Sequence, residues 1–81
     1  MIPPLQYYYY VISMSNNPKL QINIRKLRKK SGLSQEKLAR LADVANNTII
    51  KIESGENQNP TLETLQKIAK ALNITIDDLV K

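Results

Sequence analysis

The stretch from Ser34 to Gly55 reads SQEKLARLADVANNTIIKIESG, and its apolar spacing describes two short helices that meet at a tight corner. Ser34 suits the N-cap of the first helix, and the second is predicted over Asn46–Ser54, with Gly55 as its stop signal. Ala39 is small enough to let the helix backbones approach. Asp43 stands at the corner, where a left-handed backbone is needed and glycine is more usual. Helices crossing at about 90 to 120° in this way are a unit that reads duplex DNA.

Three further helices are predicted around this pair. One runs from Leu20 to a stop at Gly32, one follows the cap Thr61 and ends near Asn73, and a short last one follows Thr75, which has capping-box spacing to the acids after it. The sequence therefore predicts an all-α domain of five helices with no sheet. The residues expected to form its core are Leu20, Ile24, Leu27, Leu33, Leu38, Ala39, Ala42, Val44, Ile49, Ile52, Leu62, Leu65, Ile68, Ala69, Leu72, Ile76, Leu79 and Val80.

Composition argues against several classes of protein. A chain of 81 residues holds one small domain, and it contains no cysteine and no histidine. Disulfides, zinc-finger ligands, thiol nucleophiles and imidazole catalysis are thereby excluded, so neither an enzyme nor a cofactor is expected. The neighbouring acids Asp77 and Asp78 are better explained as helix caps than as a catalytic pair. No run of about 18 apolar residues and no secretory signal is present, which favours a cytoplasmic protein without a membrane span.

The basic residues are unevenly distributed. The net charge is +5, and eight of the twelve Lys and Arg residues lie between Lys19 and Arg40, where Glu36 is the only acid. A Lys/Arg run on a helix is usually a solvated face. Beside a predicted helix pair of the DNA-reading kind, the positive end instead favours a polyanionic partner.

The N-terminal segment differs in composition from the rest. Residues 1–18 contain all four aromatic residues of the chain, the consecutive Tyr7–Tyr10, between prolines and a polar stretch. We expect residues 1–18 to form a poorly ordered tail and residues 19–81 to form the domain. Met14 resembles a natural start, so residues 1–13 are a hypothetical upstream extension; mass spectrometry of native protein beginning at Met1 would remove that hypothesis.

The motifs of this chain resemble the phage-repressor-type helix-turn-helix family, which includes Cro and the lambda and 434 repressors and is also called the xenobiotic-response-element family. The likeness covers roughly Leu20 to Val80 and implies a lambda-repressor-like DNA-binding domain. Two positions depart from the family pattern, since Asp43 replaces glycine and Ala45 replaces the usual Ser or Thr cap. The matching run, in order and without gaps, is Leu33-Ser34-Gln35, Leu38-Ala39, Val44, Ile49, Ile52-Glu53 and Gly55.

Four residues are expected to face the groove from the helix after the corner: Asn46, Asn47, Ile50 and Lys51. An Asn amide suits an adenine edge, an Ile suits a thymine methyl, and a Lys suits guanine or phosphate, which favours an A/T-containing half-site. Two alternatives stay open. Asn46 also suits a helix cap, and Ile50 equally suits a partly buried or partner-facing position.

The resemblance also implies contacts with the DNA backbone and one internal ion pair. Phosphate contacts are expected from Gln35, at the start of a helix, and from the loop residues Gln58 and Asn59 with their main-chain N–H groups. Further contacts with the DNA backbone are expected from Thr48 and Arg40. For Arg40, an ordinary exposed residue is the stronger of the two interpretations. In relatives, the positions of Arg28 and Glu53 form an ion pair, and we interpret them as structural.

Two functions follow as hypotheses. The first is a transcriptional regulator, a repressor by preference, that binds double-stranded DNA as a homodimer on an inverted repeat, with recognition helices about 34 Å apart. The alternative is a protein-interaction module of the same fold, an antitoxin bound to a toxin or a coactivator bound to the transcription machinery. An RNA target is disfavoured because the globular part has no aromatic residue on which bases could stack.

Overall fold

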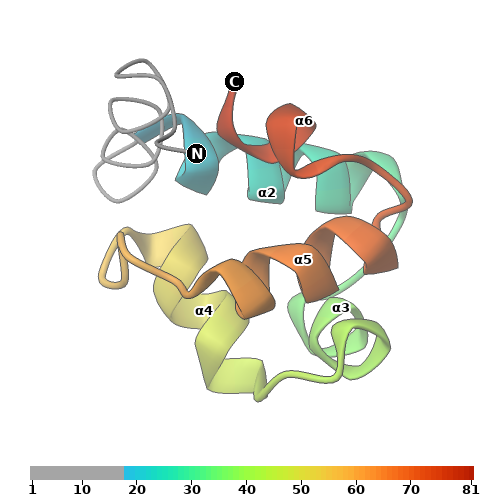
Figure 1. Ribbon diagram of the computed structural model, residues 1–81. Helices are drawn as coiled ribbons and strands as arrows, with labels where there is room; N and C mark the ends of the chain where they lie inside the picture. The colour runs from blue at the N-terminus through green and yellow to red at the C-terminus, as the bar shows by residue number, and fades with distance from the viewer. Residues whose placement is uncertain (1–17) are drawn as a thin grey trace.

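The computed structural model describes residues 18–81, and within this part of the chain the secondary structure is entirely helical. The helices α2 and α6 lie together at the top of Figure 1, α5 crosses the middle, and α3 and α4 form the lower part. Residues 1–17 of the expected tail, with Tyr7–Tyr10 and Met14, lie outside the described residues, and Pro18, also expected in the tail, is the first residue of α2. Within the described part of the chain, no helix has the length and apolar character needed to span a membrane. The bounds are α2 Pro18–Lys30, α3 Gln35–Ala42, α4 Asn46–Ser54, α5 Leu62–Ala71 and α6 Ile76–Val80.

The helix starts follow the predicted caps. Ser34 Oγ accepts the N–H of Lys37 at 3.0 Å, and Thr61 caps α5 in the same way. Thr75 forms the predicted capping box that begins α6. Helix α2 begins at Pro18, two residues before the predicted start, because proline needs no N–H partner in the first turn. The all-α prediction of five helices is confirmed for the described residues.

The corner between α3 and α4 has the predicted geometry. Asp43 is the C-cap of α3 with φ 57° and ψ 47°, in the left-handed region. The N–H of Asp43 donates to Arg40 O at 3.2 Å, and the N–H of Val44 donates to Ala39 O at 3.0 Å. Asn73 repeats this conformation after α5, with φ 58°. Asp and Asn tolerate the left-handed region better than most residues, so both corners close without glycine.

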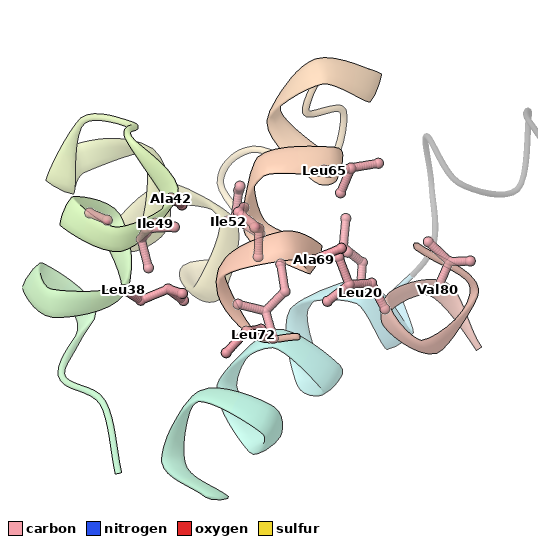
Figure 2. Packing of buried hydrophobic residues seen from close by; sticks show 13 residues of the cluster. Leu20, Leu38, Ala42, Ile49, Ile52, Leu65, Ala69, Leu72 and Val80 are labelled. Carbon is pink, nitrogen blue, oxygen red and sulfur yellow. The ribbon is translucent and has the colours of Figure 1, made fainter. Parts of the chain in front are cut away.

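The core lies where all five described helices meet (Figure 2). Leu62, predicted as part of the α5 stripe, is 56% exposed, so this prediction is wrong. As the first residue of α5, Leu62 precedes Leu65, where α5 first reaches the core. Some predicted core residues are only partly buried against the cluster: Leu27, Leu33, Val44 and Ile76. The fully enclosed part of the core contains Leu20, Ile24, Leu38, Ala39, Ala42, Ile49, Ile52, Leu65, Ile68, Ala69, Leu72, Leu79 and Val80.

Candidate nucleic-acid interface

Helix α4 has one buried and one exposed face. Ile49 and Ile52 are at most 1% exposed, and they hold α4 against the core. At 3.6 residues per turn, Asn47 and Lys51 point almost directly away from these two residues. Both are exposed, as are Asn46 and Ile50, and Ile50 is 38% exposed. The four predicted reading residues therefore share the solvent-facing side of one helix.

The start of α4 differs from that of α3. Its N-cap is Ala45, which has an extended backbone and makes no side-chain cap hydrogen bond. Asn46 is the first helical residue, so the alternative assignment of Asn46 as the cap is wrong. The N–H of Thr48 donates to Ala45 O at 2.9 Å, and the Thr48 side chain is partly buried. Asn46 is exposed at the first helical position.

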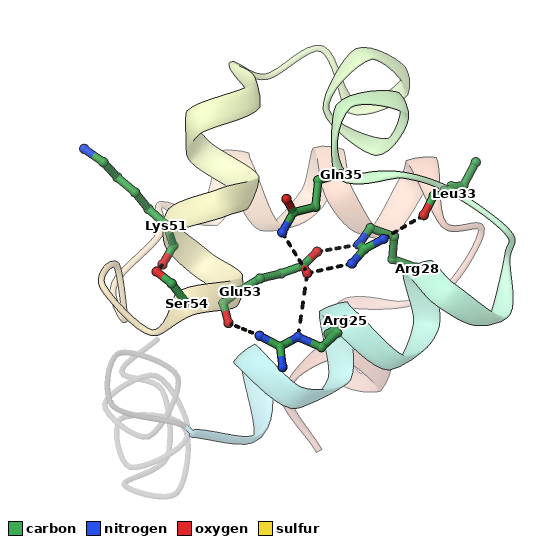
Figure 3. Close-up of polar contacts among 7 residues, drawn as sticks. All are labelled: Arg25, Arg28, Leu33, Gln35, Lys51, Glu53 and Ser54. Carbon is green, nitrogen blue, oxygen red and sulfur yellow. Dashed lines mark hydrogen bonds and ion pairs between the residues drawn. The ribbon is translucent and has the colours of Figure 1, made fainter.

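A buried carboxylate anchors the other end of α4. Glu53 is 1% exposed, and Arg28 of α2 donates two hydrogen bonds to its carboxylate, from Nε to Oε2 at 2.6 Å and from Nη2 to Oε1 at 2.9 Å (Figure 3). Arg28 Nη1 also donates to Leu33 O at 2.8 Å in the connection to α3. The hydrogen bond to Glu53 raises the pKa of Arg28 above its ordinary value. The internal ion pair expected between these positions is thus present.

Gln35 joins the same cluster. It is the first residue of α3, is partly buried, and its Nε2 donates to Glu53 Oε1 at 3.2 Å. The amide nitrogen that would donate to a phosphate is directed into the protein. The backbone N–H groups of Gln35 and Glu36 remain the natural phosphate donors at this position, since the first N–H groups of a helix have no intrahelical partner and that of Lys37 donates to Ser34 Oγ.

The loop after α4 is tied to the helix before it. The N–H of Asn57 donates to Lys51 O at 2.9 Å, and the N–H of Asn59 donates to Asn57 Oδ1 at 3.0 Å. The main-chain N–H of Asn59, expected on phosphate, is therefore engaged within the loop. The side chains of Gln58 and Asn59 are exposed. This loop presents side chains next to the reading face of α4.

Arg40 lies on the exposed surface of α3, apart from the Glu53 cluster. Its Nη2 pairs with Glu36 Oε1 at 2.9 Å, and both side chains are largely exposed. An exposed pair one helical turn apart is weak and exchanges readily with other partners. The structure therefore leaves Arg40 with an internal partner as well as access to solvent.

Arg25 makes a contact with α4 that was not predicted from the sequence. It lies three residues before Arg28 on α2, so both side chains lie on neighbouring parts of one helix surface. Its Nη2 donates to the backbone O of Glu53 at 3.0 Å. The spacing of the two arginines was the signal available in the sequence.

Comparison with known proteins identifies relatives of this arrangement. A family model described as helix-turn-helix matches residues 24–79. An uncharacterised HTH-type transcriptional regulator of Archaeoglobus fulgidus is 40% identical over 60 residues, covering 74% of this chain and 84% of the relative. The control protein C.BamHI of Bacillus amyloliquefaciens is 40% identical over 70 residues, covering 83% and 85%.

Two further relatives are a repressor and a protein of known structure. The cryptic phage CTXphi transcriptional repressor RstR of Vibrio cholerae is 42% identical over 57 residues, covering 70% of this chain and 50% of the relative. The crystal structure of the restriction-modification controller protein C.AhdI from Aeromonas hydrophila superposes with a TM-score of 0.72 at 36% identity, covering 75% of this chain and 91% of that chain.

Proposed function

The chain belongs to the phage-repressor-type helix-turn-helix family of DNA-binding transcriptional regulators, and from this premise we propose that it is a repressor that binds an inverted-repeat operator as a dimer. In this proposal residues 19–81 form the DNA-binding domain and α4 is the recognition helix. The repressor assignment draws support from the likeness to RstR, whose name describes a transcriptional repressor.

The exposed face of α4 is the observation that carries the proposal. Asn46 and Asn47 offer amides that can bond an adenine edge with two hydrogen bonds, and Lys51 offers an ammonium for guanine or phosphate. Ile50 offers a methyl surface for thymine. Aliphatic packing beneath α4 fixes the helix and thereby the directions in which these side chains leave its backbone, because Ile49 and Ile52 are enclosed. We assign the contacts with the DNA backbone to the main-chain N–H of Gln35 and to the side chains of Thr48, Gln58, Asn59 and Arg40, because the Gln35 amide and the Asn59 N–H already have partners in the protein.

The length of α4 supports dimeric binding. Its 9 residues span about 14 Å at 1.5 Å per residue, which is only a few base pairs of groove. So short a contact cannot distinguish one operator among the many competing sites of a genome. Two copies related by a two-fold axis double the readout, and their recognition helices then lie about 34 Å apart.

Selection from a random duplex library tests the proposal. We expect an inverted repeat of A/T-containing half-sites to be enriched, and we expect Asn47→Ala and Lys51→Ala to relax the selected sequence at defined positions. Gln66→Ala is the control, because Gln66 is an exposed residue of another helix, α5. An unchanged selected motif with both α4 variants would overturn the assignment of the reading residues.

Salt dependence separates DNA binding from the protein-interaction alternative. A DNA-binding dimer should lose affinity steeply with salt, with a slope of about −0.9 for each phosphate neutralised. Shallow binding with no preference among duplexes, together with a protein partner that stays bound at high salt, would favour an antitoxin or coactivator instead.

A further inference from the structure

A second guanidinium reaches the C-terminal end of α4 from the solvent side. Arg25 Nη2 donates to the backbone O of Glu53 at 3.0 Å, and Arg25 Nε lies 3.9 Å from Glu53 Oε1 (Figure 3). The Arg25 side chain is 51% exposed, whereas that of Glu53 is 1% exposed. Arg25 is therefore held at one edge while the rest of its guanidinium is in water.

The charges at this point do not balance. Arg28 already neutralises Glu53 through two short hydrogen bonds. Arg25, Arg28 and Glu53 together carry two positive charges and one negative charge, so the cluster has a surplus positive charge, and Arg25 is its exposed member. A half-exposed, anchored guanidinium with surplus charge is suited to a phosphate, which it can bind through two parallel N–H donors.

We propose that Arg25 is an additional DNA phosphate-binding residue at the C-terminal end of the recognition helix. The inference rests on the proposed function. Arg25 lies on α2, outside the helix-turn-helix itself, and its anchor is the main chain of Glu53, next to the loop that carries Gln58 and Asn59. The contact adds a phosphate position that the α4 and loop residues do not supply.

The anchor makes Arg25 more effective than an ordinary surface cation. A free Arg or Lys side chain loses rotamer freedom when it binds a phosphate. The hydrogen bond to Glu53 O has already restricted Arg25, so less freedom remains to be lost. Through this bond, Arg25 links the bound phosphate to the main chain of α4. Arg25 therefore also fixes the position of the recognition helix along the DNA backbone, without reading any base.

Affinity measured against salt concentration tests the assignment. The probes are a duplex selected by the unmodified protein from a random library and an unrelated duplex of equal length. Arg25→Gln removes the charge and leaves a polar side chain at a half-exposed position, so melting temperatures should stay near that of the unmodified protein. We expect the slope of log affinity against log salt to become shallower by about 0.9 per protomer, with both duplexes weakened by a similar factor.

Lys26→Gln is the matched control. Lys26 is the exposed neighbour of Arg25, and it takes part in none of the ion pairs found within residues 18–81. The Lys26→Gln substitution removes the same charge from the same helix, and we expect it to leave most of the slope of log affinity against log salt intact. Arg25→Lys should keep the slope and lose part of the affinity, because an ammonium lacks the planar pair of donors.

Three results would overturn the inference. The first is an Arg25→Gln variant with the slope of the unmodified protein, and the second is an equal reduction in Lys26→Gln, which would indicate general charge. The third is an unmodified protein that shows no salt-dependent duplex binding, and this result alone would overturn the proposed function as well.

Discussion

Arg28 and Glu53, which are 25 residues apart in sequence, form a bidentate ion pair, and the Glu53 side chain is 1% exposed. A carboxylate removed from water is tolerated only when its oxygens are paired and hydrogen-bonded. Arg28 of α2 and Gln35 of α3 meet this requirement through hydrogen bonds to the carboxylate, and Arg25 of α2 adds a bond to the main-chain O of the same residue. The C-terminal end of α4 is thereby attached to both preceding helices.

Replacing Glu53 by Ala should destabilise the fold by about 3 kcal/mol, because Arg28 is left largely buried without its partner. The free energy of unfolding from urea titration measures this loss. Glu36→Ala is the control, since it breaks the exposed pair with Arg40 and should change stability by about 0.5 kcal/mol or less. A loss below about 0.5 kcal/mol for Glu53→Ala would contradict a buried pairing.

Replacing Asp43 by Gly should be neutral or stabilise the protein by up to about 1 kcal/mol. The φ of 57° is strained for a residue with a Cβ, and the Asp43 side chain is exposed, so its removal takes little from the fold. Thermal melts of Asp43→Gly and Asp43→Ala give the comparison, with Ala expected to be the less stable of the two. A clear loss of stability with Gly would show that the Asp43 side chain has a role in the corner.

Replacing Ala45 by Ser should stabilise α4 by about 1 kcal/mol. Ala45 already has the extended backbone of an N-cap, with φ −64° and ψ 143°, and is exposed, so a hydroxyl at this position can accept an N–H from the first turn. Urea titration measures the gain. The reverse change at α3, Ser34→Ala, removes an existing cap and should lose a similar amount. Equal stabilities of Ala45→Ser and the unmodified protein would contradict this account of the α4 start.

The capping box of α6 should make stability depend on pH in acid. The hydrogen bond from the Thr75 N–H, at 3.2 Å, lowers the pKa of Asp78 below its ordinary value of 3.8. Because the pKa is lower in the folded state, the stabilisation is complete above the unfolded value and is lost as the pH falls through the folded value.

Asp78→Asn should therefore melt below the unmodified protein at about pH 6, and this difference should shrink toward about pH 2. Melting temperatures across that range provide the measurement. Asp77→Asn removes a neighbouring charge outside the capping box and serves as the control. A difference that stays constant with pH would exclude Asp78 ionisation as the cause.

Local features of the sequence were sufficient to predict the helices. The caps Ser34, Thr61 and Thr75, and the bounds of α4, depend on contacts between residues at most four positions apart. The left-handed corner at Asp43 is equally local, since it depends on which residues tolerate a positive φ. The exposed face of α4 followed from helical periodicity alone.

Contacts between distant residues required the tertiary structure. Gln35 turns its amide toward Glu53, and Arg25 reaches the backbone of the same residue, because α2, α3 and α4 meet at that point. Leu62 is exposed because the core begins one turn later in α5. Hydrogen bonds between neighbouring residues place the starts of α3, α5 and α6 and the corner at Asp43, so these features could be predicted from the sequence. Which polar groups share the buried Glu53 carboxylate depends on the packed fold, because Arg28 and Gln35 lie 25 and 18 residues away in sequence and reach it only when α2, α3 and α4 meet.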